Sequence, residues 1–238
     1  MKTIYTDILK AKSKNQKLLA ILLDPDKIEW DSIDILCQKI SSSNATHIFI
    51  GGSIVPENLT QKLVEKLSAK IKIPMILFPG DYTQISHKAD AILFLSLISG
   101  RNSEYLIGQH VRSVPFLNHT NLEVIPTSYI LIESGNQTAV ARVSKTLPMK
   151  RTDIELIVNT AKAGEFLGHK LCYLEAGSGA QTPLSEEIIQ NVSQNLTIPV
   201  IVGGGIRSKT QMDIIYKAGA DLIVIGTAFE KDYNFFES

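Results

Sequence analysis

The sequence has little cysteine and no cysteine pattern that suggests a bound metal. Its 238 residues include two cysteines, Cys37 and Cys172, which lie far apart in apolar segments. Neither has a histidine close by at a metal-ligand spacing, so we interpret both as reduced thiols in the core of a cytoplasmic protein. This pattern argues against a disulfide-stabilised fold and against a cysteine-based zinc site.

An excess of charge of one sign is also absent, as are long apolar runs. The 24 basic residues balance 24 acidic ones, and the basic residues are scattered. Proteins that bind nucleic acids usually concentrate basic residues on one face, so we expect no nucleic-acid partner. No apolar run approaches the ~20 residues that cross a bilayer, and the first residues lack the apolar core of a signal peptide. We therefore expect no transmembrane segment.

The sequence does contain a series of short apolar runs, which we predict to be strands: residues 18–23, 47–50, 75–78, 91–95, 122–126, 171–175, 199–202 and 222–225. They are apolar throughout rather than alternating, which is typical of strands buried on both faces of a parallel sheet. Most are separated by segments with helical periodicity, such as 56–70, 151–167 and 184–195. The alternation predicts an α/β protein: one (β/α)8 TIM-barrel domain over residues 1–238.

Two connections depart from the regular barrel pattern. Residues 79–90, between the third and fourth predicted strands, are too few for a full helix, so we expect the third helix of the barrel to be lost or shortened. Residues 133–150 form a long polar connection after the fifth predicted strand. Its length and composition indicate a lid over the active site.

Glycine and small polar residues follow most of the predicted strands, at the end where barrel enzymes carry their active sites. They are Asp24 and Asp26, residues 51–53, Gly80 and Asp81, Thr127, Glu175 with residues 177–179, residues 203–205, and residues 226–227. Their coincidence at successive strand ends is the strongest functional signal in the sequence.

The glycines after the seventh and eighth strands predict a phosphate-binding site. Each group leads into a helix, so free backbone N–H groups and the positive end of a helix dipole would meet at one point. A single glycine-rich turn is more often only a tight turn. Two adjacent turns together with the glycines of residues 177–179 favour phosphate binding.

Carboxylates at the other side of the rim predict a magnesium site. Asp24 ends the first strand and Ser53 follows the second, and Mg²⁺ prefers one or two protein oxygens completed by substrate phosphates. Asp26 could equally cap the following helix, and Asp24 could be a turn residue before Pro25.

Glu175 is our candidate general base. Tyr173, two residues earlier, lies on the same side of the strand, so the two side chains would stand next to the phosphate loops. A glutamate there could accept the proton of a substrate hydroxyl. The alternative is a carboxylate paired with a strand-end lysine or arginine. We assign no catalytic role to the five histidines, His47, His87, His110, His119 and His169.

Taken in order, the motifs resemble one family over nearly the whole chain: LLDPDK, IFIGGS, ILFPG, PTSYILIESG, YLEAGSGA, VGGGIRS and GADLIVIGTAFE. The chain resembles the geranylgeranylglyceryl phosphate synthases, prenyltransferases that make the first ether bond of archaeal-type lipids. The resemblance implies a modified barrel without its third helix. It also implies Mg²⁺-dependent attack by the 3-hydroxyl of sn-glycerol 1-phosphate on a polyprenyl diphosphate, geranylgeranyl by expectation, with release of pyrophosphate.

The resemblance also implies roles for individual residues. Asp24 and Ser53 would hold Mg²⁺ with the diphosphate, and Glu175 would be the base beside Tyr173. The implied sn-glycerol 1-phosphate site comprises Tyr173, Leu174, Glu175, Ala176, Gly177, Ser178, Gly179, Gly204, Gly205, Gly226 and Thr227. Candidates for the prenyl groove, each of which could instead be ordinary core, are Ile76, Phe78, Leu93, Phe94 and Leu97.

One departure from the family concerns positive charge. One branch has a lysine where this chain has Leu22, and our hypothesis is that Lys27 or Arg207 supplies the missing charge. Two other functions remain open: a sugar-phosphate isomerase or aldolase, and a non-enzymatic sensor of a phosphate metabolite. Against an aldolase, no predicted strand carries the lysine that a Schiff base needs. An isomerase would need a second acid or base opposite Glu175, for which Asp24 is the candidate. A sensor would have no need of a base such as Glu175. We further expect a homo-oligomer and transient contact with a membrane surface.

Overall fold

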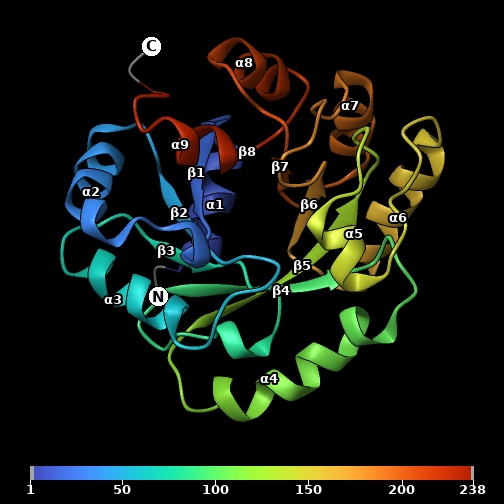
Figure 1. Cartoon of the computed structure of the whole chain (residues 1–238). Coiled ribbons are helices and arrows are strands. Elements are labelled where there is room, and N and C mark those ends of the chain that lie inside the picture. The colour runs from blue at the N-terminus through green and yellow to red at the C-terminus, as the bar shows by residue number, and fades with distance from the viewer. Residues whose placement is uncertain (1–2, 237–238) are drawn as a thin grey trace.

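The computed structural model describes residues 3–236 (Figure 1). Within them, eight parallel strands pair in chain order and the last pairs with the first, which closes a barrel. The strands are β1 (Leu18–Leu23), β2 (His47–Ile50), β3 (Met75–Leu77), β4 (Ala91–Leu97), β5 (Glu123–Leu131), β6 (Leu171–Glu175), β7 (Val200–Gly203) and β8 (Leu222–Ile225). The predicted barrel is confirmed.

Helices cover the outside of the barrel: α2 (Ile33–Ser42), α3 (Leu59–Ser68), α4 (Gln109–Leu117), α6 (Ile154–Phe166), α7 (Glu186–Asn195), α8 (Lys209–Lys217) and the short α9 (Thr227–Lys231). Their starts follow capping rules. Ser185 and Ser208 accept backbone N–H groups of Ile188 and Gln211, and so begin α7 and α8. In the described part of the chain no helix is long and apolar enough to cross a membrane.

Two apolar clusters explain why the strands are apolar along their whole length. One fills the barrel interior, with Ala20, Phe49 and Leu93 among its members. The other lies between the strands and the surrounding helices, where Ile48 and Ile188 belong. Since successive side chains of a strand point to opposite faces, each strand contributes to both clusters.

The third helix is reduced to one turn, as predicted. Only the 3₁₀ turn η3 (Tyr82–Gln84) separates β3 from β4. The buried Gln84 side chain donates a hydrogen bond to the Gly52 carbonyl at 2.8 Å and accepts one from the Gly52 N–H at 3.3 Å. A side-chain amide thus fixes the loop after β2.

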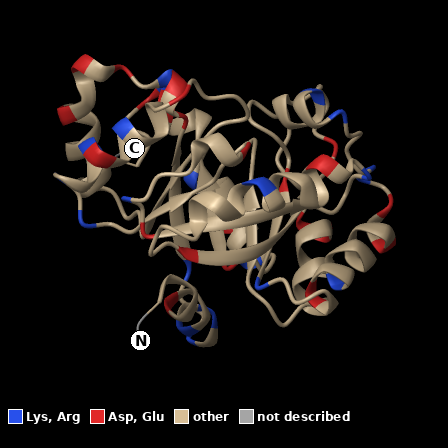
Figure 2. Cartoon of the chain, turned by 90° about the horizontal axis from the view of Figure 1, so that it is seen from below, with Lys and Arg blue, Asp and Glu red and all other residues tan. Residues whose placement is uncertain are grey.

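A helix before the first strand was not predicted. It is α1 (Ile4–Ser13), and its Ile8 and Ala11 pack against the cluster in the barrel interior. Glu123 at the start of β5 accepts the Ile4 and Tyr5 N–H groups at 2.6 and 3.2 Å. Figure 2 shows this helix below the barrel, apart from the ring of helices, and lysine and arginine segments interspersed with acidic ones over the chain.

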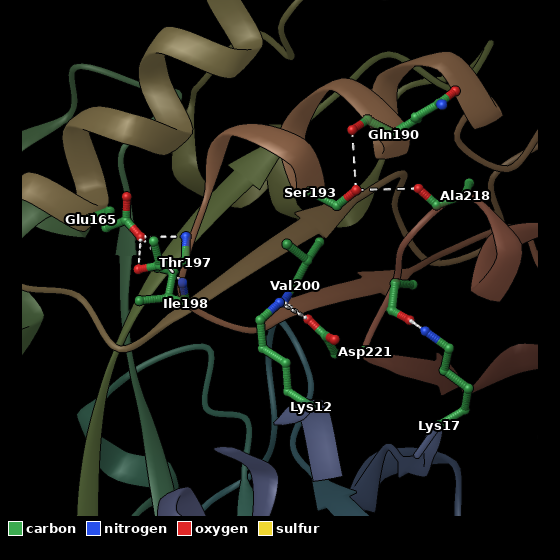
Figure 3. Close-up of polar contacts among 11 residues, drawn as sticks. Lys12, Lys17, Glu165, Gln190, Ser193, Thr197, Ile198, Val200, Ala218 and Asp221 are labelled. Atoms are coloured by element: carbon green, nitrogen blue, oxygen red, sulfur yellow. Dashed lines mark hydrogen bonds and ion pairs between the residues drawn. The ribbon is translucent and has the colours of Figure 1, made fainter. Parts of the chain in front are cut away.

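Carboxylates also tie elements together where the later strands begin (Figure 3). Glu165 of α6 accepts hydrogen bonds from the backbone and hydroxyl of Thr197 and from the Ile198 N–H, just before β7. Asp221 accepts from the Val200 N–H at 2.9 Å and from Lys12 at 2.8 Å. These contacts join α1, α6, β7 and β8.

The predicted end of the fifth strand was wrong. We placed it at residue 126 and Thr127 at the rim, whereas β5 continues to Leu131. Thr127 is completely buried and its hydroxyl donates to the Ile125 carbonyl. Pro126 caused the error, because proline is rare inside central strands. It is tolerated here with its carbonyl accepting the Lys170 N–H at 2.8 Å.

Residues 133–150 are more ordered than their composition indicates. Ile132 and Met149 form an isolated bridge at the base of the connection. Between them lies α5 (Ala139–Ser144), capped by the Thr138 hydroxyl. That this connection moves as a lid stays a prediction.

Candidate active site

A cavity of about 780 Å³ opens at the carboxyl ends of the strands. Its lining contains most of the predicted site residues: Asp24, Asp26, Ser53, Gly80, Asp81, Tyr173, Glu175, Ser178, Gly179, Gly204, Gly205, Gly226 and Thr227. Residues of α5 line it as well. The barrel therefore brings together, in one cavity, strand ends that are far apart in the chain.

Glu175 ends β6 and is almost completely buried, with 5% of its surface exposed. Its carboxylate accepts the Gly177 N–H and the hydroxyls of Tyr173 and Tyr129. Burial raises the pKa of this carboxyl, the three hydrogen bonds partly counteract burial, and the resulting pKa is about 7. A group with that pKa can accept a proton near neutral pH.

Tyr129 was missed as a site residue. It lies on β5 opposite Tyr173 in the strand register, and the two rings meet edge to face with centroids 5.4 Å apart. Phe78 stacks on Tyr173 at 5.2 Å. Burial raises the pKa of both tyrosines well above 10, so both hydroxyls remain hydrogen-bond donors to Glu175. Tyr129 belongs to the motif PTSYILIESG. Because we ended the fifth strand at residue 126, we did not recognise that the Tyr129 side chain lies beside Glu175.

The glycine-rich loops crowd against Glu175. Gly204 has a φ of 89°, and a Cβ atom there would lie 2.7 Å from Glu175 Oε1 and from the Gly177 nitrogen. Only glycine allows this approach of the loop after β7 to the carboxylate. Ser178 Oγ lies 3.3 Å from Thr227 Oγ1, so the loops after β6 and β8 also meet.

Three residues of the implied glycerol phosphate site lie behind the cavity wall. The Leu174 side chain belongs to the apolar cluster outside the barrel, and so does that of Ala176. Gly177 is covered by Thr138, whose methyl would meet a Cβ at 2.1 Å. These residues shape the loop, while their neighbours Tyr173, Glu175, Ser178 and Gly179 face the cavity.

Asp24 and Ser53 lie on the opposite rim. Gly52 packs directly on Asp24, since a Cβ there would be 2.5 Å from Asp24 Oδ1. Asp24 Oδ1 accepts the Asp26 N–H, so Asp24, and not Asp26, caps the turn η1 (Pro25–Lys27). Asp26 thus does not have the capping role that we considered for it.

The oxygen atoms at this rim could provide some, but not all, of the ligands of a Mg²⁺ ion. The Asp24 carboxylate, the Ser53 hydroxyl and nearby backbone carbonyls are oxygen ligands, which this ion prefers. Among residues 3–236 no group of three or more histidine, cysteine, aspartate or glutamate side chains could hold a metal. The remaining ligands would therefore come from the substrate and from water.

The other end of the cavity is apolar and extends beneath the shortened third connection. Phe78, Leu93, Phe94 and Leu97 line it, as predicted for a groove. Ile76 is completely buried in the barrel interior and does not line the cavity, so for this candidate the alternative of ordinary core packing holds. Beyond Phe94 the wall continues through Tyr105 of η4 (Glu104–Gly108, a π-helical turn) and His110 of α4. The Phe94 and His110 rings are 4.2 Å apart.

The candidate cations near the rim lie in different places. Leu22 lines the cavity beside Gly226, where one family branch has lysine. Arg207 lines the cavity too, and its guanidinium donates to the Ala180 carbonyl at 2.6 Å. Lys27 Nζ lies 3.1 Å from Asp24 Oδ2 and 3.4 Å from Glu230 Oε2.

Comparisons with known proteins agree with the fold and the motifs. The PcrB family matches residues 8–237. Geranylgeranylglyceryl phosphate synthase of Flavobacterium johnsoniae is 60% identical over 99% of this chain and 97% of its own length. That of Picrophilus torridus is 37% identical over 99% of this chain and 96% of its own length.

The crystal structure of (S)-3-O-geranylgeranylglyceryl phosphate synthase from Thermoplasma acidophilum, in complex with substrate sn-glycerol-1-phosphate, superposes on this chain with a TM-score of 0.92. It is 33% identical and covers 100% of this chain and 95% of that one. The chain belongs to the PcrB family, among the geranylgeranylglyceryl phosphate synthases.

Proposed function

We propose that the chain is a prenyltransferase that forms an ether bond between sn-glycerol 1-phosphate and geranylgeranyl diphosphate. The observation that carries the proposal is the buried Glu175 carboxylate beneath three glycine-rich loops, in a cavity whose far end is apolar. Its full-length relatives have the same named activity, and the Thermoplasma acidophilum protein binds the glycerol phosphate.

In the proposed reaction, the loops after β6, β7 and β8 bind the phosphate of the acceptor. The 3-hydroxyl then lies against Glu175, which takes its proton as the oxygen bonds to C1 of the prenyl chain. The bond from C1 to the diphosphate oxygen breaks, and pyrophosphate leaves with the electron pair. Tyr129 and Tyr173 hold the carboxylate in position by donating to it.

Asp24 and Ser53 would hold Mg²⁺ with the diphosphate. When bound, the ion supplies positive charge that stabilises the leaving group. The backbone of residues 52–53 is held close to Asp24 by Gln84, and so these oxygens are fixed before substrate arrives. The prenyl chain would lie along Phe78, Leu93, Phe94 and Leu97 and would exclude water from the reacting carbon.

A sugar-phosphate isomerase is less well supported by the cavity. An isomerase would use Asp24 as a second acid or base, but the Lys27 ammonium engages this carboxylate. A small sugar would also leave the apolar half of the cavity unfilled.

Assembly and cellular location are further proposals. On η4 and α4, Ile107, Val111 and Val114 recur at helical spacing and are 58%, 64% and 46% exposed. This apolar stripe supports a homo-oligomer, since such faces are usually covered by another chain. We also propose a cytoplasmic enzyme that contacts the membrane surface transiently to release its apolar product.

The proposal is tested by a transfer assay with labelled sn-glycerol 1-phosphate, Mg²⁺ and prenyl diphosphates of increasing length. We expect a labelled product that extracts into organic solvent, requires Mg²⁺ and is made fastest with the geranylgeranyl substrate. The enantiomer, sn-glycerol 3-phosphate, serves as the control acceptor and should react far more slowly. Absence of product with every chain length would overturn the proposal.

A further inference from the structure

Glu230 is a cavity residue to which neither the sequence motifs nor the proposed reaction gives a role. It lies on α9, three residues after Thr227, and lines the cavity. Its carboxylate accepts the backbone N–H of Asp24 and pairs with Lys27. One side chain therefore connects the loop after β8 with the loop after β1, which are the proposed phosphate side and the proposed diphosphate side.

Lys27 lies between two carboxylates. The distances from its Nζ to Asp24 Oδ2 and Glu230 Oε2, 3.1 and 3.4 Å, place both within ion-pair range. The side chains of Asp24 and Glu230 are only 18% and 16% exposed, so they are held by their surroundings. The Lys27 side chain is 48% exposed and has a flexible four-carbon stem. The ammonium is thus the mobile member of the group.

This arrangement has a consequence for a cation at Asp24. A divalent ion that binds Asp24 alone meets an ammonium already in contact with the same carboxylate, and like charges at such distances repel. A ligand carrying negative charge reverses this repulsion, because the Lys27 ammonium can then donate to the ligand oxygens while it stays paired with Glu230. The trio would accordingly disfavour bare metal and favour metal accompanied by diphosphate.

We propose that Lys27 is a diphosphate-binding residue, held ready by Glu230, that occupies the Asp24 carboxylate until the diphosphate arrives. This inference rests on the proposed function for the identity of the diphosphate and deepens it by assigning two further residues. Lys27 touches the substrate, and Glu230 is a positioning residue that acts through Lys27.

The test uses Lys27→Met and two ligands whose binding needs no turnover. Mn²⁺ alone is followed by electron paramagnetic resonance, and pyrophosphate in saturating Mg²⁺ is followed by calorimetry. We expect opposite effects: Mn²⁺ alone binds several-fold more tightly because Asp24 is freed, and pyrophosphate binds about tenfold or more weakly because a charged donor is lost. Lys231→Met is the matched control, since Lys231 lines the same cavity and pairs with no described acidic residue. It should change either affinity by less than about twofold.

Glu230→Gln tests the positioning role. Glu230→Gln has two effects on pyrophosphate binding. It removes a negative charge from the cavity, which happens in any background, and it frees the Lys27 ammonium, which happens only when Lys27 is present. We therefore compare its effect on pyrophosphate binding in the wild-type and Lys27→Met backgrounds. Positioning predicts that the two effects differ by at least about threefold.

Effects of the same sign on both ligands, or a Lys27→Met variant that matches the Lys231→Met control, would overturn the inference. Equal effects of Glu230→Gln in both backgrounds would overturn the positioning role. These readouts are separate from prenyl transfer. An enzyme that makes no ether product but shows the crossed effect contradicts the proposed function alone, and an active enzyme without the crossed effect contradicts this inference alone.

Discussion

At the scale of single residues, the proposed chemistry depends on one carboxylate and its surroundings. Glu175 is buried enough to raise its pKa to about 7, and three hydrogen bonds keep the pKa from rising further. Burial therefore makes this carboxylate a stronger base than an exposed glutamate, while a useful fraction of it stays ionised near neutral pH. The same hydrogen bonds fix its orientation toward the space where the acceptor hydroxyl would lie.

Replacing Glu175 by glutamine should remove the base and leave the site's shape. We expect kcat to fall by about 10²–10⁴, because that is the usual contribution of a positioned general base, while affinity for sn-glycerol 1-phosphate changes little. Steady-state kinetics and calorimetry measure the two quantities. Glu187→Gln, an exposed substitution on α7, is the control. A fall in affinity that accounts for the whole loss of kcat/KM would show that Glu175 binds and does not catalyse.

At the scale of elements, the shortened connection between β3 and β4 borders the apolar end of the cavity, which is the proposed prenyl groove. A single turn, η3, replaces a full helix after β3, and Phe78 and Phe94 line the cavity beside it. Gln84 provides a fixed contact in the absence of the helix, because its amide satisfies both backbone groups of Gly52. The loop that bears Ser53 is held through this contact.

Gln84→Ala should therefore act on one substrate. It leaves the half-buried N–H and carbonyl of Gly52 without their side-chain partner, which costs about 1 kcal/mol of stability, and it loosens the loop beside Asp24. We expect the KM for the prenyl diphosphate to rise about tenfold while that for sn-glycerol 1-phosphate stays within about twofold. Chemical denaturation and initial rates with each substrate varied in turn measure this. Equal increases for both substrates would contradict it, and Gln190→Ala on α7 is the control.

The predictability of the elements follows from how local their signals are. The strands buried on both faces were found from their apolar runs, and the short link of residues 79–90 revealed the missing helix. α1 was not predicted, because its amphipathic pattern has meaning only when the barrel interior offers Ile8 and Ala11 a place to pack. The end of β5 was wrong because Pro126 gives a local stop signal that the neighbouring strands override.

Site residues at the ends of strands were predictable from the sequence, whereas a site residue inside a strand was not. Glu175 ends β6, Asp24 and most of the glycines follow strands directly, and the sequence placed all of them at the rim. Tyr129 lies within β5, and its contact with Glu175 depends on the register between β5 and β6, which the sequence does not express. The Lys27–Glu230 pair joins residues far apart in the chain and depends on barrel closure.

At the scale of the whole molecule, the candidate active site and the hydrogen-bonded carboxylates Glu165 and Asp221 lie at opposite ends of the barrel. Carboxylates at the end where the later strands begin are paired and hydrogen-bonded, as for Glu165 and Asp221 (Figure 3). Burial alone would raise the pKa of Glu165, but hydrogen bonds from Lys162, Thr197 and Ile198 outweigh it and lower the pKa to about 2. The charged form of Glu165 therefore stabilises the fold.

Glu165→Gln should lower stability without changing the chemistry. The folded pKa lies below the unfolded value of about 4.3, so the contribution is present above that pH and is lost as the pH falls toward 2. We expect a loss of about 1–3 kcal/mol at pH 7 and a smaller difference from wild type near pH 3, measured by urea denaturation. Unchanged kcat is expected. A difference that grows on acidification would contradict this account.

The most direct test of the central claim is the pH dependence of kcat/KM for prenyl transfer, measured on the wild type, Tyr129→Phe and Glu175→Gln. If Glu175 is the base, wild-type activity falls on acidification with an apparent pKa of about 7. Loss of the Tyr129 hydrogen bond should move that limb upward by about one unit, because the ionised carboxylate is less stabilised. Glu175→Gln should have no such limb. A limb that keeps its position in both variants would show that another group accepts the proton.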